Sequence, residues 1–111
     1  MAVLVKHARN TRVKQSGARG LSEALLTGPA LGCSKFTVRR INLDEEGCTA
    51  AGSTDKVTFY FILSGKVVLS HQEGELDPME PGTGAVTHPG ERHHLRNIYK
   101  GSSTVLAVKE Q

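Results

Sequence analysis

The sequence has few aromatic residues, few cysteines and no long apolar run. Tryptophan is absent, and aromatic residues make up 5% of the 111 positions. The longest apolar run extends only from Phe59 to Leu63. A membrane-spanning helix needs about 20 consecutive apolar residues, so we expect no membrane span.

The sequence also lacks the features of an exported protein. Met1 to Lys6 holds one short apolar patch followed by basic residues, without the charge-then-apolar order or the cleavage site of a signal peptide. Cys33 and Cys48 form no CxxC pattern, and two isolated cysteines are most simply free thiols. We therefore expect a cytoplasmic protein.

The net charge of +3 is concentrated near the N-terminus. Residues 1–22 contain five basic residues and no acid, whereas residues 23–111 contain nine basic and eleven acidic residues. A chain of this length suits a single domain, so we expect a basic arm at 1–20 and a barrel domain at 21–111. Nucleic-acid binding is disfavoured because the arm lacks interleaved aromatic residues and any recognised motif.

Short strands separated by turns account for the apolar pattern. Twelve glycines and four prolines divide the chain into short apolar stretches, and helical periodicity is almost absent. Apolar stretches 57–63 and 66–70 flank Ser64-Gly65, which predicts a hairpin. About eight strands predict an all-β sandwich or barrel. We expect them at 21–26, 35–43, 57–63, 66–70, 84–87, 93–98 and 103–109, with a further strand unassigned.

Two segments resemble the paired motifs of the cupin family, whose members are small barrels with the two motifs facing each other across a pocket. The tail of the first motif, G(X)5HXH(X)3-4E(X)6G, matches the stretch from Thr58 to Gly65. The last half of the second motif, G(X)5PXG(X)2H(X)3N, matches Gly90 to Asn97, with His88 where the proline belongs. The resemblance covers roughly residues 20–108. It implies an all-β, cupin-type double-stranded β-helix, or jelly-roll barrel, similar to small single-domain RmlC-like cupins.

The resemblance also implies a metal site from which most ligands are missing. In the family, two histidines and a glutamate of the first motif join a histidine of the second to hold a divalent metal, often iron, manganese, nickel or zinc. Here Thr58 stands at the glutamate position, and only His93 of the set remains. One imidazole is too few for a stable transition-metal site. The two missing histidines correspond either to Gly52 and Thr54 or to Ala51 and Ser53.

A remodelled metal site remains a candidate. His88 lies five residues before His93 around a turn, and this pair provides the metal ligands we would expect first. His94 points away from His93 if the stretch is a regular strand. Further donors that could complete such a site are Asp55, His94 and Cys48.

Alternation along the strands predicts which side chains share the lumen. If Thr58 faces inward, Tyr60 does too, and His93 and Asn97 face them from the second motif. Tyr60 and His93 are candidate catalytic acid and base toward a sugar or small organic acid. The alternative is that both are packed, hydrogen-bonded core residues.

Adjacent arginines add a candidate for binding a carboxylate or phosphate. Arg39 and Arg40 are neighbours on one expected strand, so one of them faces the interior or an interface. The alternative is that one is solvated and the other lies in a subunit contact. The candidate ligand-binding residues are Thr58, Tyr60, Arg40, His88, His93 and Asn97.

The sequence and the family resemblance together leave three alternative functions. The leading expectation is a small-molecule-binding domain that forms a homodimer, because a strand at 57–63 with apolar residues on both faces needs a cover. The competing expectation is a metal-dependent dioxygenase, isomerase or lyase, as members of the family often are, with His93 as a ligand. A regulatory subunit is the third, and the absence of a helix-turn-helix segment counts against a self-contained regulator.

Overall fold

The computed structural model describes residues 13–15, 20–28, 32–49, 51–71 and 74–111. All regular elements in these ranges are strands, and none of the described segments forms a helix that could cross a membrane. The strands are β1 (Val13–Gln15), β2 (Leu21–Thr27), β3 (Phe36–Leu43), β4 (Thr58–Ser64), β5 (Val67–His71), β6 (Gly74–Glu75), β7 (Gly84–Thr87), β8 (His93–Asn97) and β9 (Ser103–Glu110).

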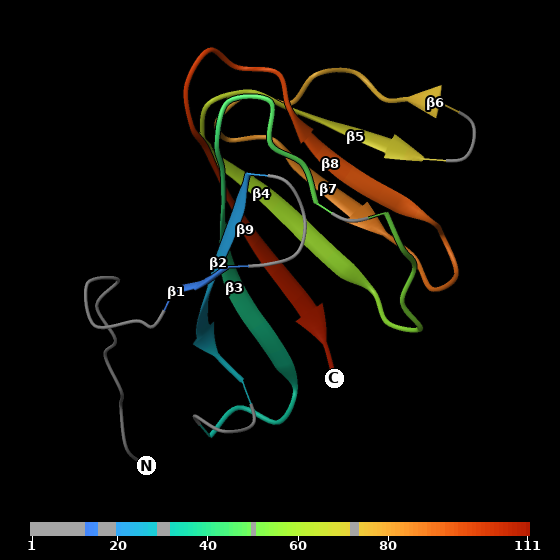
Figure 1. Ribbon diagram of the computed structural model, residues 1–111. Helices are drawn as coiled ribbons and strands as arrows, with labels where there is room; N and C mark the ends of the chain where they lie inside the picture. Colours follow the sequence, from blue (N-terminus) through green and yellow to red (C-terminus); the bar gives the residue numbers. More distant parts are fainter. Residues whose placement is uncertain (1–12, 16–19, 29–31, 50, 72–73) are drawn as a thin grey trace.

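Two antiparallel sheets form the barrel. The large sheet has the order β1-β2-β3-β9-β4-β7, and the small sheet has the order β6-β5-β8. Figure 1 shows the small sheet at the upper right and the strands β2, β3 and β9 on the other side of the molecule. After β4 the chain passes repeatedly between the sheets, since β5, β6 and β8 belong to the small sheet and β7 and β9 to the large one, so it wraps the core as a jelly roll. The expected all-β jelly-roll barrel is confirmed.

The expected strands are present, but the predicted hairpin is wrong. Within the large sheet β4 pairs with β9 on one side and β7 on the other, whereas β5 pairs with β6 and β8. Both edges of β4 are therefore occupied, and the chain crosses to the other sheet at Gly65. That glycine has a φ of 84°, and a Cβ there would collide with Ser103. The short turn at Ser64-Gly65 therefore connects two strands of different sheets and does not close a hairpin.

One end of the barrel is filled by aliphatic side chains from both sheets. Ile62 and Val105 of the large sheet and Val67 and Leu95 of the small sheet are fully buried. Burying such a side chain contributes about 1.5–3 kcal/mol, so this cluster holds the sheets together. It also fixes which face of every strand points inward.

Two further predictions concern the N-terminal arm and the thiols. Strand β1 lies within the expected arm and pairs with β2 at the edge of the large sheet. The rest of residues 1–19 lies outside the described residues, so the boundary of the arm stays a prediction. Cys33 and Cys48 are free thiols and partly exposed.

Candidate functional site

The strand register places polar side chains at the other end of the lumen. Thr58, Tyr60 and Ile62 alternate on β4, and Ile62 belongs to the core, so all three face inward. Tyr60 is paired with Ala107 of β9 and Ala85 of β7. One row further out, Thr58 is paired with Lys109 and Thr87. The inward orientation predicted for Thr58 and Tyr60 is confirmed.

The small sheet contributes two histidines to the same end of the lumen. His93 is paired with His71 and Leu95 with Leu69, and both leucines belong to the core. His71 and His93 therefore project to the inside one row beyond the leucines. His93 is buried, whereas His94 points to the other face and is half-buried. His71 is not among the residues that the sequence predicts for the site.

Tyr60 and His93 meet across the lumen. The Tyr60 hydroxyl oxygen lies 2.8 Å from His93 Nε2, and the rings meet edge to face with centroids 5.6 Å apart. His93 Nδ1 lies 3.0 Å from the carbonyl oxygen of Glu91, which can only accept. Nδ1 therefore carries the proton in the neutral ring, and Nε2 accepts a hydrogen bond from the Tyr60 hydroxyl.

The surroundings of Tyr60 favour its protonated form. Burial, and next to it the negative charge of Glu23, raise the pKa of Tyr60 to about 12. Glu23 is paired with Ile41 and so lies on the inner face of β2. At neutral pH the phenol is thus a hydrogen-bond donor, and the basic atom of the pair is His93 Nε2.

Two cavities open beside this pair. One of about 190 Å³ is lined by His71, Thr87, Glu91 and His93, together with Leu76 and apolar residues of β5 and β7. The other, of about 240 Å³, also touches His71 and His93 and continues past Ala51 and Arg92. Both are large enough for a small organic molecule, and His93 is common to them.

The first-motif positions do not fit a metal. Gly52 pairs with His93 through two backbone hydrogen bonds, of 3.1 and 3.0 Å. The register thus assigns the histidine positions to Gly52 and Thr54. Gly52 has no side chain and open space beside it, and the Thr54 hydroxyl accepts from the backbone N–H of Lys56.

The remaining donors do not complete a site. Among the described residues no three His, Cys, Asp or Glu side chains are grouped as metal ligands. At the glutamate position Thr58 supplies a neutral hydroxyl, which is a poor ligand for iron, nickel or zinc. The candidate donors Asp55 and Cys48 join no such group. The donor set of this chain therefore does not match the metal centre that the resemblance implies.

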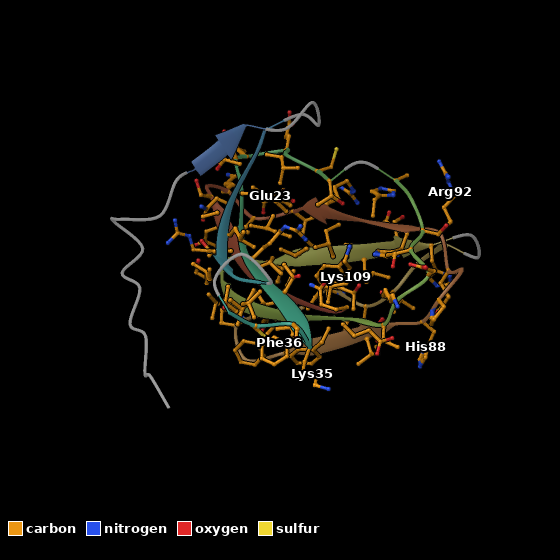
Figure 2. All side chains as sticks on the ribbon, turned by 90° about the horizontal axis from the view of Figure 1, so that it is seen from below. Glu23, Lys35, Phe36, His88, Arg92 and Lys109 are labelled. Atoms are coloured by element: carbon orange, nitrogen blue, oxygen red, sulfur yellow. The ribbon has the colours of Figure 1, made fainter. Side chains whose placement is uncertain are left out.

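His88 is not brought together with His93. Its side chain is 70% exposed and lies 3.1 Å from the Glu91 carboxylate, which also accepts from the backbone N–H of His88 at 2.6 Å. These bonds to His88 lower the pKa of Glu91. In Figure 2 His88 projects outward from the ring of strands. The Glu91 contact holds it at the rim.

Arg40 faces away from the lumen, which corrects its selection as a ligand-binding residue. Ile41 and Leu43 of the same strand belong to the core, so Arg39 shares the inner face and Arg40 the outer one. Arg39 is paired with Ala107 in the row of Tyr60. Arg40 Nε is buried without a hydrogen-bond partner among the described residues.

Asn97 is inward-facing, as predicted, but its polar atoms are occupied. Its amide nitrogen donates to the carbonyl oxygens of Leu43, Asp44 and Gly101 at 3.2, 2.8 and 2.8 Å. Its carbonyl oxygen accepts from the Ser103 hydroxyl at 2.6 Å and the Tyr99 backbone N–H at 3.0 Å. Asn97 thus ties loops together at the closed end of the barrel, away from the cavities.

Solved structures share this fold. No protein-family model matches the chain, and no curated protein matches its sequence. The polyketide cyclase RemF from Streptomyces resistomycificus is 17% identical with a TM-score of 0.87, and the match covers 98% of this chain and 80% of that one. A sugar phosphate isomerase from a cupin superfamily, from Silicibacter pomeroyi DSS-3, is 26% identical with a TM-score of 0.74, covering 89% and 68%. An RmlC-like cupin from Shewanella frigidimarina NCIMB 400 is 11% identical with a TM-score of 0.81, covering 98% and 91%.

Proposed function

We propose that this small protein of the cupin fold binds a sugar or small organic acid at the open end of its barrel. The observation that carries the proposal is the 2.8 Å hydrogen bond between Tyr60 and His93, because His93 lines both cavities. A buried polar pair beside an open cavity can bind a ligand through its remaining lone pairs. Pockets of this kind, mostly apolar with a few convergent polar groups, are typical ligand sites.

Features of the lumen support a ligand that carries oxygen atoms. Tyr60 donates a hydrogen bond to His93, and its oxygen remains an acceptor for a ligand hydroxyl. Thr87 and His71 line the same cavity and add polar groups within it. The structural neighbours named above include a cyclase and a sugar phosphate isomerase, which supports a small-molecule partner.

The same hydrogen bond favours a second candidate, an enzyme that transfers protons. A neutral His93 accepts from Tyr60, and a protonated His93 would donate through Nε2 to the same oxygen. Tyr60 and His93 can thus relay a proton between a ligand and the imidazole, as general acid and base. No step of this proposal uses a metal, because the first-motif positions supply no metal-binding side chains.

We also propose a homodimer, located in the cytoplasm. The outer face of the large sheet carries exposed apolar side chains, including Phe59, Leu63 and Val86, which are 38%, 46% and 51% exposed. Phe59 is paired with Val86 and with Val108, so these residues form a continuous apolar surface across β7, β4 and β9. A second copy is the simplest cover for it.

The test is a thermal-shift series with neutral sugars, sugar acids and small organic acids. The protein, Tyr60→Phe and the control Tyr99→Phe are compared, because the Tyr60 hydroxyl is bonded to the cavity residue His93, whereas Tyr99 is 50% exposed in the loop before β9. At least one compound should stabilise the native protein and the control but shift Tyr60→Phe less. Stabilisation that Tyr60→Phe retains in full would contradict a site at this pair.

A further inference from the structure

The outermost row of the inner wall combines one cation with two unpartnered hydroxyls. Lys109, Thr58 and Thr87 are direct partners on the adjacent strands β9, β4 and β7. Directly paired residues of an antiparallel sheet have Cβ atoms about 4.5–5.5 Å apart. The three side chains are therefore neighbours on one face. Figure 2 places Lys109 within the ring of strands, whereas His88 and Arg92 project outside it.

The two hydroxyls point to a missing partner. Thr58 and Thr87 are each only 4% exposed, and neither side-chain oxygen has a hydrogen-bond partner among the described residues. A buried hydroxyl left unpaired costs about 1–3 kcal/mol. Thr37, in the same row beyond Lys109, differs because its hydroxyl already accepts from the Gln111 amide. A ligand that accepts hydrogen bonds would satisfy Thr58 and Thr87 together.

The charges around this row select an anion. Lys109 makes no ion pair with a described residue, and Arg39 adds a second positive charge one row deeper. Glu23 supplies the opposing negative charge near Tyr60. Glu110 belongs to the other face of β9, where its carboxylate accepts from the backbone N–H of Val57 at 3.1 Å. On the inner faces of the strands two cations thus stand against one carboxylate. A second carboxylate, Glu91, lies at the rim of the cavity that Thr87 lines, where it accepts from the backbone N–H of His88.

We propose that Lys109, Thr58 and Thr87 form an oxyanion subsite, so that the ligand is a small molecule bearing a carboxylate or phosphate. This inference rests on the proposed function and specifies the ligand class of the same site. Thr58 occupies the position where the resemblance implies a metal-binding carboxylate. In this chain a neutral donor beside an ammonium group has replaced it, and such a set attracts an anion rather than a cation. The uncharged remainder of the ligand extends toward Tyr60 and His93.

The test measures binding of three sets of probes by isothermal titration calorimetry. The carboxylates are malate and gluconate, the phosphates are inorganic phosphate and glucose 6-phosphate, and glucose is the neutral control. The variants are Thr58→Val, which keeps the side-chain shape, Lys109→Met, which keeps the aliphatic stem, and Tyr60→Phe, which tests the proposed function. Lys100→Met is the matched control, because Lys100 is exposed in the loop before β9.

The expected result is that anions of at least one set bind more tightly than glucose, and that Lys109→Met and Thr58→Val each weaken them tenfold or more. Lys100→Met should leave the affinity unchanged. Thr58→Val should unfold at the same temperature as the native protein or higher, because it removes an unpartnered hydroxyl. The set that binds identifies the oxyanion as carboxylate or phosphate.

Three results would overturn the inference. Glucose binding in a Tyr60-dependent way, with no preference for either anion set, would refute the oxyanion subsite and leave the proposed function standing. Anion binding that survives in both variants would locate the charge recognition elsewhere. If no probe of any set binds in a Tyr60-dependent way, the proposed function fails together with the subsite.

Discussion

Tyr60 of the large sheet and His93 of the small sheet lie 2.8 Å apart, hydroxyl oxygen to Nε2, and join the two halves of the barrel across its open end. The carbonyl of Glu91 holds Nδ1 of the same imidazole at 3.0 Å and so fixes its tautomer. Both ring nitrogens are thereby assigned, and Tyr60 is the donor at neutral pH.

Tyr60 should titrate far above neutral pH. Burial and Glu23 raise its pKa to about 12, above its ordinary value of 10.0. The folded state therefore holds this proton more tightly than the unfolded state. The resulting stabilisation is fully present below pH 10 and is lost as the pH rises through 12, by at most about 1.4 kcal/mol per pH unit. Tyrosinate absorbance near 295 nm should show a step near pH 12 that Tyr60→Phe removes. A Tyr60→Phe variant with the complete native titration would show that the phenol is not shielded.

Asn97 should be required for stability. Replacing it by alanine leaves three carbonyl oxygens and the Ser103 hydroxyl without their present partner. Since each unpaired buried group costs about 1–3 kcal/mol, Asn97→Ala should lower the free energy of unfolding in urea by about 3 kcal/mol or more.

The matched control is Asn42→Ala. Asn42 makes one side-chain hydrogen bond, from the Thr104 hydroxyl at 3.0 Å, and is partly exposed. Its replacement should cost about 1 kcal/mol or less. Equal effects of the two substitutions would mean that the Asn97 network does not support the closed end.

The apolar outer face should mediate self-association. Phe59 lies within this face and stacks with Phe61, the ring centroids being 6.4 Å apart. Light scattering should give the mass of a dimer for the native protein and of a monomer for Phe59→Glu. Tyr99→Glu changes an aromatic residue in a loop that is more exposed than Phe59, 50% against 38%, and should stay dimeric. A native protein that is monomeric at micromolar concentration would contradict the proposal.

Divalent metals should leave the native protein unchanged. The lumen offers no three grouped ligands among the described residues, so Fe²⁺, Mn²⁺, Ni²⁺ and Zn²⁺ should not raise its melting temperature. The variant Gly52→His/Thr58→Glu adds two donors beside His93 and should be stabilised by at least one of these metals, since three protein ligands suffice for a site. Metal that co-purifies with the untagged native protein and is lost in His93→Ala would contradict this account.

The fold was accessible from the sequence because strand alternation and motif spacing are local properties. The motif positions of Thr58 and His93 imply that both face the lumen, and alternation along β4 adds Tyr60. The choice between Arg39 and Arg40 failed because β3 carries apolar residues on both faces, Phe36 and Val38 on one and Ile41 and Leu43 on the other. Only the fold shows that Ile41 and Leu43 belong to the core.

Other features depend on which strands pair, and the sequence carries little signal for them. The turn at Gly65 has the composition of a hairpin, yet β4 already has two neighbours and the chain changes sheets. His71 and Lys109 become part of the site only through their pairing with His93 and Thr58. Asn97 was predicted to face inward. The hydrogen bonds from its amide group to backbone carbonyl oxygens could not be predicted, because the loops that carry these oxygens meet only in the folded chain.

The measurement that tests the central claim most directly is a titration of the ¹⁵N-labelled protein with gluconate, glucose and glucose 6-phosphate, followed by amide chemical shifts. A ligand in the barrel mouth should perturb the amides of β4, β7 and β8 around Tyr60, Thr87 and His93, and leave the outer-face positions of β3 unchanged. Saturating shifts confined to that end would support the account. Shifts confined to the outer face, or no shifts with any of the three compounds at millimolar concentration, would contradict it.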